Sequence, residues 1–176
     1  AGGLGTSAVQ LAKHLGAEVT AVASRRNLGF LRDLGADHVI DYAAEDFTRR
    51  RGAYDVIFDT VGKVPFGKAR RALTSDGVYL SPVLGLGLLF RMLWTGKFGR
   101  RKARFSATGL LPHAELSSRL AEVKTLIEDG ALKTIIDRRY GLEHIAEAHG
   151  YVQSGHKRGN VVLEVDHHDV AILAAE

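Results

Sequence analysis

The first residues of the chain have the composition of a phosphate-binding turn. The segment AGGLGT at positions 1–6 contains Gly2, Gly3 and Gly5 and leads directly into a stretch with helical spacing. Glycines let backbone N–H groups approach a phosphate closely, and the positive end of a helix dipole favours an anion there. A glycine-rich turn can equally be a plain connection, so this motif alone leaves both interpretations open.

A hydroxyl residue and two arginines follow about 20 residues later, at the end of a strand-like run: Ser24, Arg25 and Arg26. In dinucleotide-binding folds this position lies beside the adenosine ribose, where an acidic residue favours NAD and an arginine accommodates the 2′-phosphate of NADP. None of the three positions is acidic. The cluster therefore favours NADP(H) over NAD(H), and the alternative is a solvated helix cap with surface arginines.

Small and polar residues also end two further strand-like runs. The segment DTVG at positions 59–62 ends one of them, and Ser81 and Pro82 end the next. In open α/β sheets, ligands bind at the carboxyl ends of the parallel strands. A nucleoside-triphosphate loop is excluded, because no Gly-Lys pair is followed by Ser or Thr.

The elements that must position these residues alternate between β-branched runs and helical patterns closed by glycine. Strands are predicted over residues 18–23, 38–40, 54–58 and 77–80, and helices over 6–15, 27–34 and 65–73, with Asn27 as a helix cap. This alternation indicates an α/β fold with parallel crossovers and an open sheet covered on both faces. Later strands are predicted over 104–108, 134–137 and 160–165, and helices over 142–154 and 113–128, the last with an apolar stripe of Leu116, Leu120, Val123 and Ile127.

The residue types exclude several kinds of site. The 176 residues include no cysteine, so disulfides, thiolate zinc sites and cysteine nucleophiles are excluded. His144 and His149 are five positions apart, a spacing that does not place two zinc ligands on one helix face. The tail contains the run His167, His168 and Asp169, for which no partner is assigned. We therefore expect no zinc in this chain.

The net charge of +4 is concentrated at positions 97–104, where five of eight residues are basic. Such a run can face nucleic acid, an anionic membrane or a bound anion, and the few interleaved aromatic residues disfavour nucleic acid. The apolar segment Val83–Trp94 is interrupted by Arg91 and is too short to span a membrane. We expect it to cover the nicotinamide end of a cofactor or to form a subunit contact, with peripheral membrane binding as the alternative. No signal peptide is visible, so a cytoplasmic protein is expected.

Five separated motifs follow one another in a characteristic order: AGGLGTSAVQLAKHLGAEVTAVASRRN, LGADHVIDY, YDVIFDTVG, RRALTSDGVYL and KRGNVVLEV. In this order they resemble the medium-chain dehydrogenase/reductase superfamily, in its quinone-oxidoreductase-like and alcohol-dehydrogenase-like branch. The resemblance implies a Rossmann-type, doubly wound parallel sheet that binds NADP(H). It also implies an oxidoreductase that transfers a hydride between nicotinamide and a carbonyl, enone, quinone or alcohol. No Tyr-x-x-x-Lys pattern occurs, which argues against a short-chain reductase.

The resemblance implies cofactor contacts at a defined set of positions and no catalytic or metal-binding residue in this chain. The pyrophosphate loop corresponds to Gly2, Gly3, Leu4 and Gly5. The 2′-phosphate positions correspond to Ser24 and Arg26, with Arg25 between them. The adenine side corresponds to Tyr42, and the nicotinamide half to Val61, Ser81 and Val83.

The family order also implies a strand and a further domain before Ala1. We expect residues 1–132 to form a dinucleotide-binding domain truncated before its first strand, residues 133–166 a returning segment, and residues 167–176 a tail. The missing strand would lie between the predicted strands 18–23 and 54–58, which then either stand about 10 Å apart around an empty slot or pair directly. Because the other domain carries most of the substrate pocket, this chain alone is expected to be inactive.

The expected partner is a small-molecule substrate, without nucleic acid, and the parent enzyme could be a homodimer. Two alternatives from another function class stay open. One is a nucleotide-binding module without catalysis, such as a redox sensor, and the other is a degenerate fragment.

Overall fold

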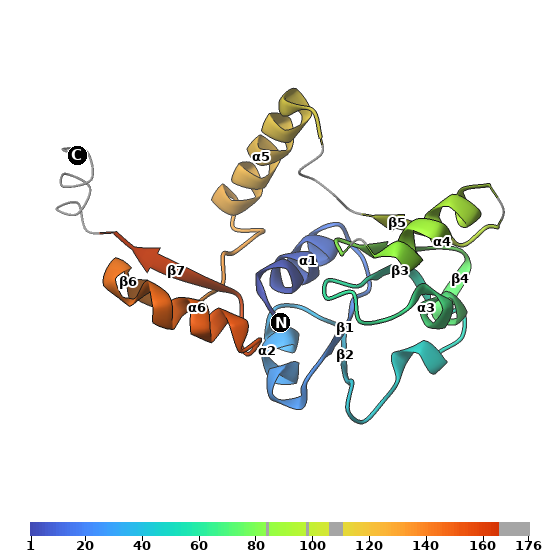
Figure 1. The fold of residues 1–176 in the computed structure, drawn as a ribbon, viewed down its shortest axis with the longest axis horizontal. Helices are drawn as coiled ribbons and strands as arrows, with labels where there is room; N and C mark the ends of the chain where they lie inside the picture. The colour runs from blue at the N-terminus through green and yellow to red at the C-terminus, as the bar shows by residue number, and fades with distance from the viewer. Residues whose placement is uncertain (84, 98, 106–110, 166–176) are drawn as a thin grey trace. The chain divides into compact units, whose positions relative to one another are not determined.

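The computed structural model describes residues 1–83, 85–97, 99–105 and 111–165, in which helices and strands alternate along the sequence (Figure 1). These residues divide into two compact units. The first unit comprises residues 1–39 together with the described residues from Val123 onward. The second unit is continuous and comprises Ile40–Glu122.

The N-terminal part of the first unit contains helix α1 (Gly3–His14), strand β1 (Thr20–Ala23), the short 3-10 helix η1 (Arg25–Asn27) and helix α2 (Leu28–Asp33). The boundary between the units falls within the next strand, β2 (His38–Asp41). β1 and β2 are neighbours in a two-stranded sheet. Both helices end at a glycine with positive φ, 78° at Gly16 and 103° at Gly35, as the sequence predicts. The core between these elements consists of Val9, Ala21, Ala23, Leu31 and Ala36.

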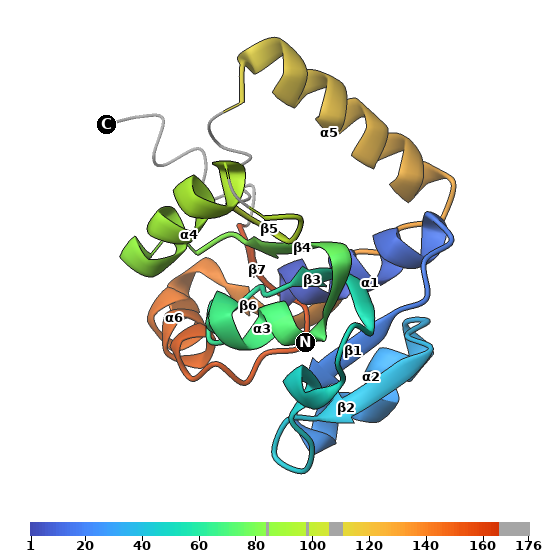
Figure 2. The ribbon, with the colours of Figure 1, turned by 90° about the vertical axis from the view of Figure 1, so that its right-hand side faces the viewer.

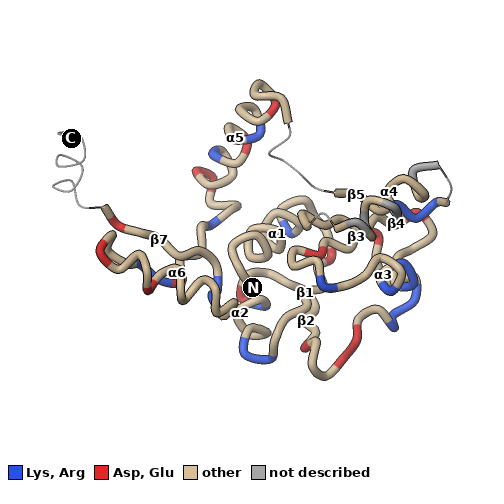
Figure 3. Tube along the Cα trace, viewed as in Figure 1, with Lys and Arg blue, Asp and Glu red and all other residues tan. Residues whose placement is uncertain are grey.

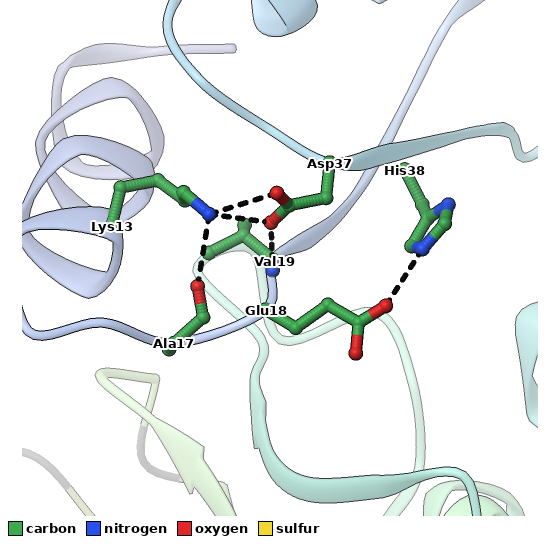
Figure 4. A network of polar contacts seen from close by, with 6 residues as sticks. All are labelled: Lys13, Ala17, Glu18, Val19, Asp37 and His38. Carbon is green, nitrogen blue, oxygen red and sulfur yellow. Dashed lines mark hydrogen bonds and ion pairs between the residues drawn. The ribbon is translucent and has the colours of Figure 1, made fainter.

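A polar network ties the end of α1 to the starts of β1 and β2 (Figure 4). The Lys13 ammonium lies 2.8 and 2.9 Å from the two carboxylate oxygens of Asp37 and also donates to the Ala17 carbonyl. Asp37 accepts a further hydrogen bond of 2.7 Å from the Val19 N–H. The bond from Lys13 and then the bond from Val19 hold the pKa of Asp37 below its usual value. The network fixes where both strands begin.

The C-terminal part of the first unit contains strand β6 (Ile136–Gly141), the turn η4 (Leu142–His144), helix α6 (Ile145–Gln153) and strand β7 (Asn160–Glu164). β6 and β7 pair in parallel, from Ile136 opposite Asn160 to Gly141 opposite Glu164. An isolated parallel bridge joins Gly2 to Gly159, so the two ends of the described chain meet in this unit. The Gly159 N–H donates to the Ala1 carbonyl at 2.9 Å.

The second unit contains η2 (Phe47–Arg49), strand β3 (Tyr54–Phe58), helix α3 (Phe66–Ala72), strand β4 (Leu73–Ser81), helix α4 (Leu86–Lys97) and strand β5 (Lys102–Phe105). Its three strands form a parallel sheet in the order β3-β4-β5. Helix α3 packs against β4, and α4 packs against β5 (Figure 2). Ala69, Ala72 and Leu73 are fully buried, because small side chains let α3 approach the strand closely.

Helix α5 (His113–Glu128) has the predicted bounds but no buried residue among those it contains. Its expected apolar stripe is largely exposed, at 60% for Leu120, 40% for Val123 and 45% for Ile127. The amphipathic pattern therefore predicts the helix correctly but not a covered face.

The described strands form three separate sheets rather than one open sheet. Among them, β1 and β3 belong to different sheets, so the direct pairing considered for a missing strand is not seen. Val56, in the middle of β3, is 57% exposed. The separation of β1 from β3 and the three-part domain division stay predictions.

Candidate functional site

The glycine loop starts α1 at Gly3, three residues before the predicted start. Gly2 is the N-cap residue, and no side chain in the described part of the chain caps the helix there. The first turn contains no acidic residue, and a methyl group placed on Gly5 would meet no heavy atom within 4 Å. Leu4 is 50% exposed. A helix start without a side-chain cap, open space at Gly5 and a first turn without acidic residues fit a bound pyrophosphate.

The loop that ends β1 contains Ser24, Arg25 and Arg26. Both arginines are exposed, and Ser24 is partly exposed. Asn27, expected to cap α2, makes no cap hydrogen bond with its side chain. It is buried instead, and its amide donates to the Ser24 hydroxyl oxygen at 3.2 Å. The residue serves the loop rather than the helix.

An arginine from the C-terminal segment completes this loop. Arg158 Nε lies 2.8 Å from Asn27 Oδ1, and its Nη2 lies 2.8 Å from the Arg26 carbonyl oxygen. The sequence does not indicate this contact, because 131 positions separate Arg158 from Asn27. The available signal is the Lys-Arg-Gly segment at 157–159, in which Gly159 has a φ of 85°.

Beside the same loop is an open hollow of about 330 Å³ that is rich in cationic side chains. Its lining comprises Arg26, Asp137, Arg138, Tyr151, His156 and Arg158. The Arg138 guanidinium stacks 3.8 Å above the centre of the Tyr151 ring. Partial burial acts to raise the pKa of Asp137, but the Tyr151 hydroxyl, the Arg158 N–H and the guanidinium groups outweigh it and hold that pKa below its usual value. With three arginines against one carboxylate, the hollow has the charge that a phosphate requires.

The predicted residues of the second unit lie around the ends of β3 and β4. The Asp59 carboxylate accepts hydrogen bonds from the N–H groups of Val61 and Gly62 at 3.1 and 2.8 Å. It also accepts from the Val64 N–H at 2.8 Å and from the Tyr79 hydroxyl at 3.0 Å. Burial, together with the charge of Asp59, raises the pKa of the Tyr79 hydroxyl. Asp59 therefore organises the turn that presents Val61, which is 61% exposed.

The turn at Gly62 and the loop at Val83 come close together within this unit. A methyl group placed on Gly62 would lie 2.8 Å from Val83 Cβ, so the glycine allows the two loops to touch. Ser81 is buried, and its hydroxyl oxygen accepts from the Val83 N–H at 3.2 Å. Tyr42 follows β2 and is 65% exposed. The eleven predicted cofactor residues are thus divided between the two units, and their assembly into one site stays a prediction.

The basic run at 97–104 makes contacts inside the second unit. Arg100 binds both carboxylate oxygens of Asp76, at 2.8 and 2.9 Å. Arg101 Nε donates to the carbonyls of Leu73 and Thr74, and Lys102 Nζ donates to the Thr95 carbonyl at 2.7 Å. These side chains hold β4 and β5 in place. These basic side chains therefore have a structural role, which the interpretation of the run as an anion-binding stretch does not predict.

The apolar segment 83–94 contains most of α4. Met92 packs against the core of the second unit, whereas Leu89, Leu93 and Trp94 are 42%, 69% and 68% exposed. The side chain of Leu88 lies outside the described part. The expected role of this segment as a cover for a cofactor stays a prediction.

No three His, Asp or Glu side chains in the described ranges come together as a metal site. His144 Nδ1 lies 2.9 Å from a carboxylate oxygen of its neighbour Glu143. The run His167, His168 and Asp169 lies outside the described residues. Within the part that the structure describes, no helix has the length and apolar character needed to cross a membrane.

Comparisons with known proteins agree with this geometry. A profile of the zinc-binding dehydrogenase family matches residues 34–163. A chloroplast envelope quinone oxidoreductase homolog of Arabidopsis thaliana is 30% identical over 170 residues, which cover 93% of this chain and 50% of that protein. The structure of the quinone oxidoreductase from Coxiella burnetii superposes with a TM-score of 0.77 at 30% identity, covering 94% of this chain and 50% of that one. The Escherichia coli quinone oxidoreductase, solved in complex with NADPH, has a TM-score of 0.75 at 25% identity, covering 93% and 54%.

The chain spans about half the length of the curated relatives it matches. The structural likeness confirms the α/β, Rossmann-type fold predicted from the sequence. The family match covers well over half of the chain and confirms the resemblance based on the five motifs. The chain belongs to the zinc-binding dehydrogenase family, within the medium-chain dehydrogenase/reductase superfamily.

Proposed function

We propose that this chain is the NADP(H)-binding part of an oxidoreductase that transfers a hydride between nicotinamide and a carbonyl, enone, quinone or alcohol. The observation that carries the proposal lies in the first unit. There the start of α1 has no side-chain cap, and the same C-terminal segment contacts both this glycine loop and the loop with Ser24 and Arg26. The names of the relatives, among them quinone oxidoreductases and one solved with NADPH, support the reaction class and the cofactor.

The residues of the chain bind and orient the cofactor. The N–H groups around Gly2, Gly3 and Gly5 hold the pyrophosphate, because the helix start supplies donors and a favourable dipole. Ser24, Arg25 and Arg26 hold the 2′-phosphate through charge-assisted hydrogen bonds. In the second unit, Tyr42 is assigned to the adenine side, and Val61, Ser81 and Val83 are assigned to the nicotinamide half.

The bound cofactor supplies the hydride, and the chain supplies binding and orientation. No residue of this chain is assigned as a proton donor. Substrate contacts, a homodimeric assembly and a cytoplasmic location stay predictions for the whole protein, and relatives include proteins named for the chloroplast and the mitochondrion.

The first test is a calorimetric titration of the full-length protein with NADPH and with NADH. Charge-assisted hydrogen bonds of about 1.5–3 kcal/mol each should make NADPH bind roughly ten- to a hundredfold more tightly. Gly5→Asp should abolish binding of both dinucleotides, since its carboxylate would stand where the pyrophosphate lies. Gly150→Asp is the matched control, because Gly150 is also a helical glycine with no heavy atom within 4 Å of an added methyl group. Equal affinities for the two dinucleotides would remove the 2′-phosphate assignment.

The second candidate, a nucleotide-binding module without catalysis, is separated by turnover. Oxidation of NADPH by the full-length protein in the presence of a quinone or an enone, lost in Gly5→Asp, supports the oxidoreductase. Tight NADPH binding without oxidation of the cofactor across such acceptors would favour the module.

A further inference from the structure

We propose that Arg158 is a positioning residue that sets the preference for NADP(H) by fixing the hydroxyl of Ser24 as a hydrogen-bond donor to the 2′-phosphate. This inference rests on the proposed function, because it concerns how that site distinguishes two dinucleotides. It assigns the specificity partly to the C-terminal segment, which lies more than 130 positions from the loop.

The first step is the orientation of the Asn27 side chain. An amide has one acceptor and one donor end, and its partners decide which end faces which neighbour. Arg158 Nε donates to Asn27 Oδ1 at 2.8 Å, so the NH₂ group must face the other way. There it donates to Ser24 Oγ at 3.2 Å. Asn27 is 7% exposed, so water has little access with which to replace these partners.

The second step concerns the Ser24 hydroxyl. A hydroxyl has one proton to donate and two lone pairs that accept. Because Asn27 occupies a lone pair of Ser24 Oγ, the hydroxyl proton points elsewhere and is available to an anion. A 2′-phosphate accepts such a proton, whereas the 2′-hydroxyl of NAD does not require a donor at this place. The relay from Arg158 through Asn27 to Ser24 thus acts on the one group in which the two cofactors differ.

The third step is the rigidity of Arg158 itself. Its N–H donates to Asp137 Oδ2 at 2.9 Å, and the same oxygen accepts from the Tyr151 hydroxyl at 2.7 Å. Arg158 Nη2 also donates to the Arg26 carbonyl at 2.8 Å, which holds the backbone of the arginine pair. A loop held in its binding conformation before the ligand arrives loses less entropy on binding. Lysine cannot replace this geometry, because one ammonium does not match two acceptors as a planar guanidinium does.

The test measures NADPH and NADH affinities of the full-length protein and of its Arg158→Ala and Arg158→Lys variants. Both variants should lose about tenfold in NADPH affinity and keep NADH affinity within about twofold, since a tenfold change corresponds to one lost hydrogen bond of ordinary strength. Arg139→Ala is the matched control. Arg139 follows Arg138, which lines the hollow, but Arg139 itself does not line it. Its Nη1 donates to an exposed Glu164 carboxylate oxygen at the end of β7, at 2.9 Å.

A double-mutant cycle with Ser24→Ala distinguishes positioning from direct contact. If Arg158 acts through Ser24, the double variant loses no more NADPH selectivity than Ser24→Ala alone. Additive losses would show that Arg158 acts by a route other than Ser24, either on the phosphate itself or through the Arg26 backbone, and would overturn the relay. A parallel fall in both affinities would reduce Arg158 to a residue needed for folding and would also overturn it. A wild-type protein that binds neither dinucleotide would overturn the proposed function and this inference together, whereas unchanged NADPH selectivity in Arg158→Ala would overturn the inference alone.

Discussion

The glycine loop of the first unit and the Asp59 turn of the second differ in whether a side chain accepts hydrogen bonds from their backbone N–H groups. Each contains several such groups. In the second unit the Asp59 carboxylate accepts three of them, from Val61, Gly62 and Val64, so the turn is complete without a ligand. In the first unit no described side chain caps α1 at Gly2. A turn whose N–H groups bond to its own carboxylate is a scaffold, whereas a helix start without a side-chain cap is where an external anion is expected.

The two units also differ in net charge. The second unit, residues 40–122, contains 14 Lys and Arg against 8 Asp and Glu, a net charge of +6. The remaining residues contain 10 against 12, a net charge of −2. Figure 3 shows basic residues gathered on α3, and Lys68 and Arg71 line an open hollow of about 490 Å³ there. The predicted phosphate loops nevertheless lie in the net negative unit, so local placement of donors decides the site rather than total charge.

The largest effect is expected from removing the carboxylate that completes the turn. Asp59→Ala leaves three N–H groups without their acceptor and leaves the Tyr79 hydroxyl with the Val64 carbonyl alone, so we expect a loss of about 2–4 kcal/mol in unfolding free energy. Urea denaturation of the full-length protein measures it. Asp55→Ala, on the strand β3 that precedes this turn, removes a carboxylate that accepts from the Thr74 hydroxyl at the surface and should cost under about 1 kcal/mol. Equal losses in the two variants would mean that the Asp59 turn is not the special scaffold described here.

A smaller effect is expected in the glycine loop of the first unit, where stability and NADPH binding should change in opposite directions. Gly5→Ala should raise the unfolding free energy by up to about 1 kcal/mol, because alanine favours a helix and the added methyl group meets nothing. The same methyl group should weaken NADPH binding. Gly3→Ala should lower stability by about 1 kcal/mol, because its methyl group would collide with Asn160 Oδ1, whose amide also bonds the Ile135 carbonyl. Thermal denaturation with and without NADPH separates the two contributions, and unchanged NADPH binding in Gly5→Ala would contradict an anion site there.

The smallest effect concerns a surface ion pair of the second unit. Arg100 and then Ser75 lower the pKa of Asp76 from 3.8 to about 2. Because the folded-state pKa is depressed, the stabilisation is present above the unfolded value of 3.8 and disappears as the pH falls toward about 2. Stability profiles of wild type and Arg100→Gln should therefore differ slightly near neutral pH and converge below pH 3.8. Profiles that stay parallel down to pH 2 would exclude this linkage.

Local patterns predicted the elements well, and long-range contacts explain what they missed. The bounds of β3 and α5 agree with the prediction, because β-branched alternation and helical spacing are strong there. β4 begins at Leu73 instead of the predicted Gly77. Leu73 pairs with Tyr54 and Val78 pairs with Val56, so the polar residues between them belong to an irregular part of the strand and not to a loop. The spacing of glycines and arginines predicts the cofactor loops, and their role stays a prediction. Arg158 is not predicted, because nothing in a local window indicates a partner at Asn27.

The bridge between Gly2 and Gly159 also orders events during synthesis. The second unit is one uninterrupted stretch, so it can fold as soon as its residues have left the ribosome. The first unit draws its parts from both ends of the described chain, and its glycine loop must wait for a partner that is translated more than 150 positions later. Until then the glycine loop lacks its contact with Gly159, so this part of the first unit is completed last.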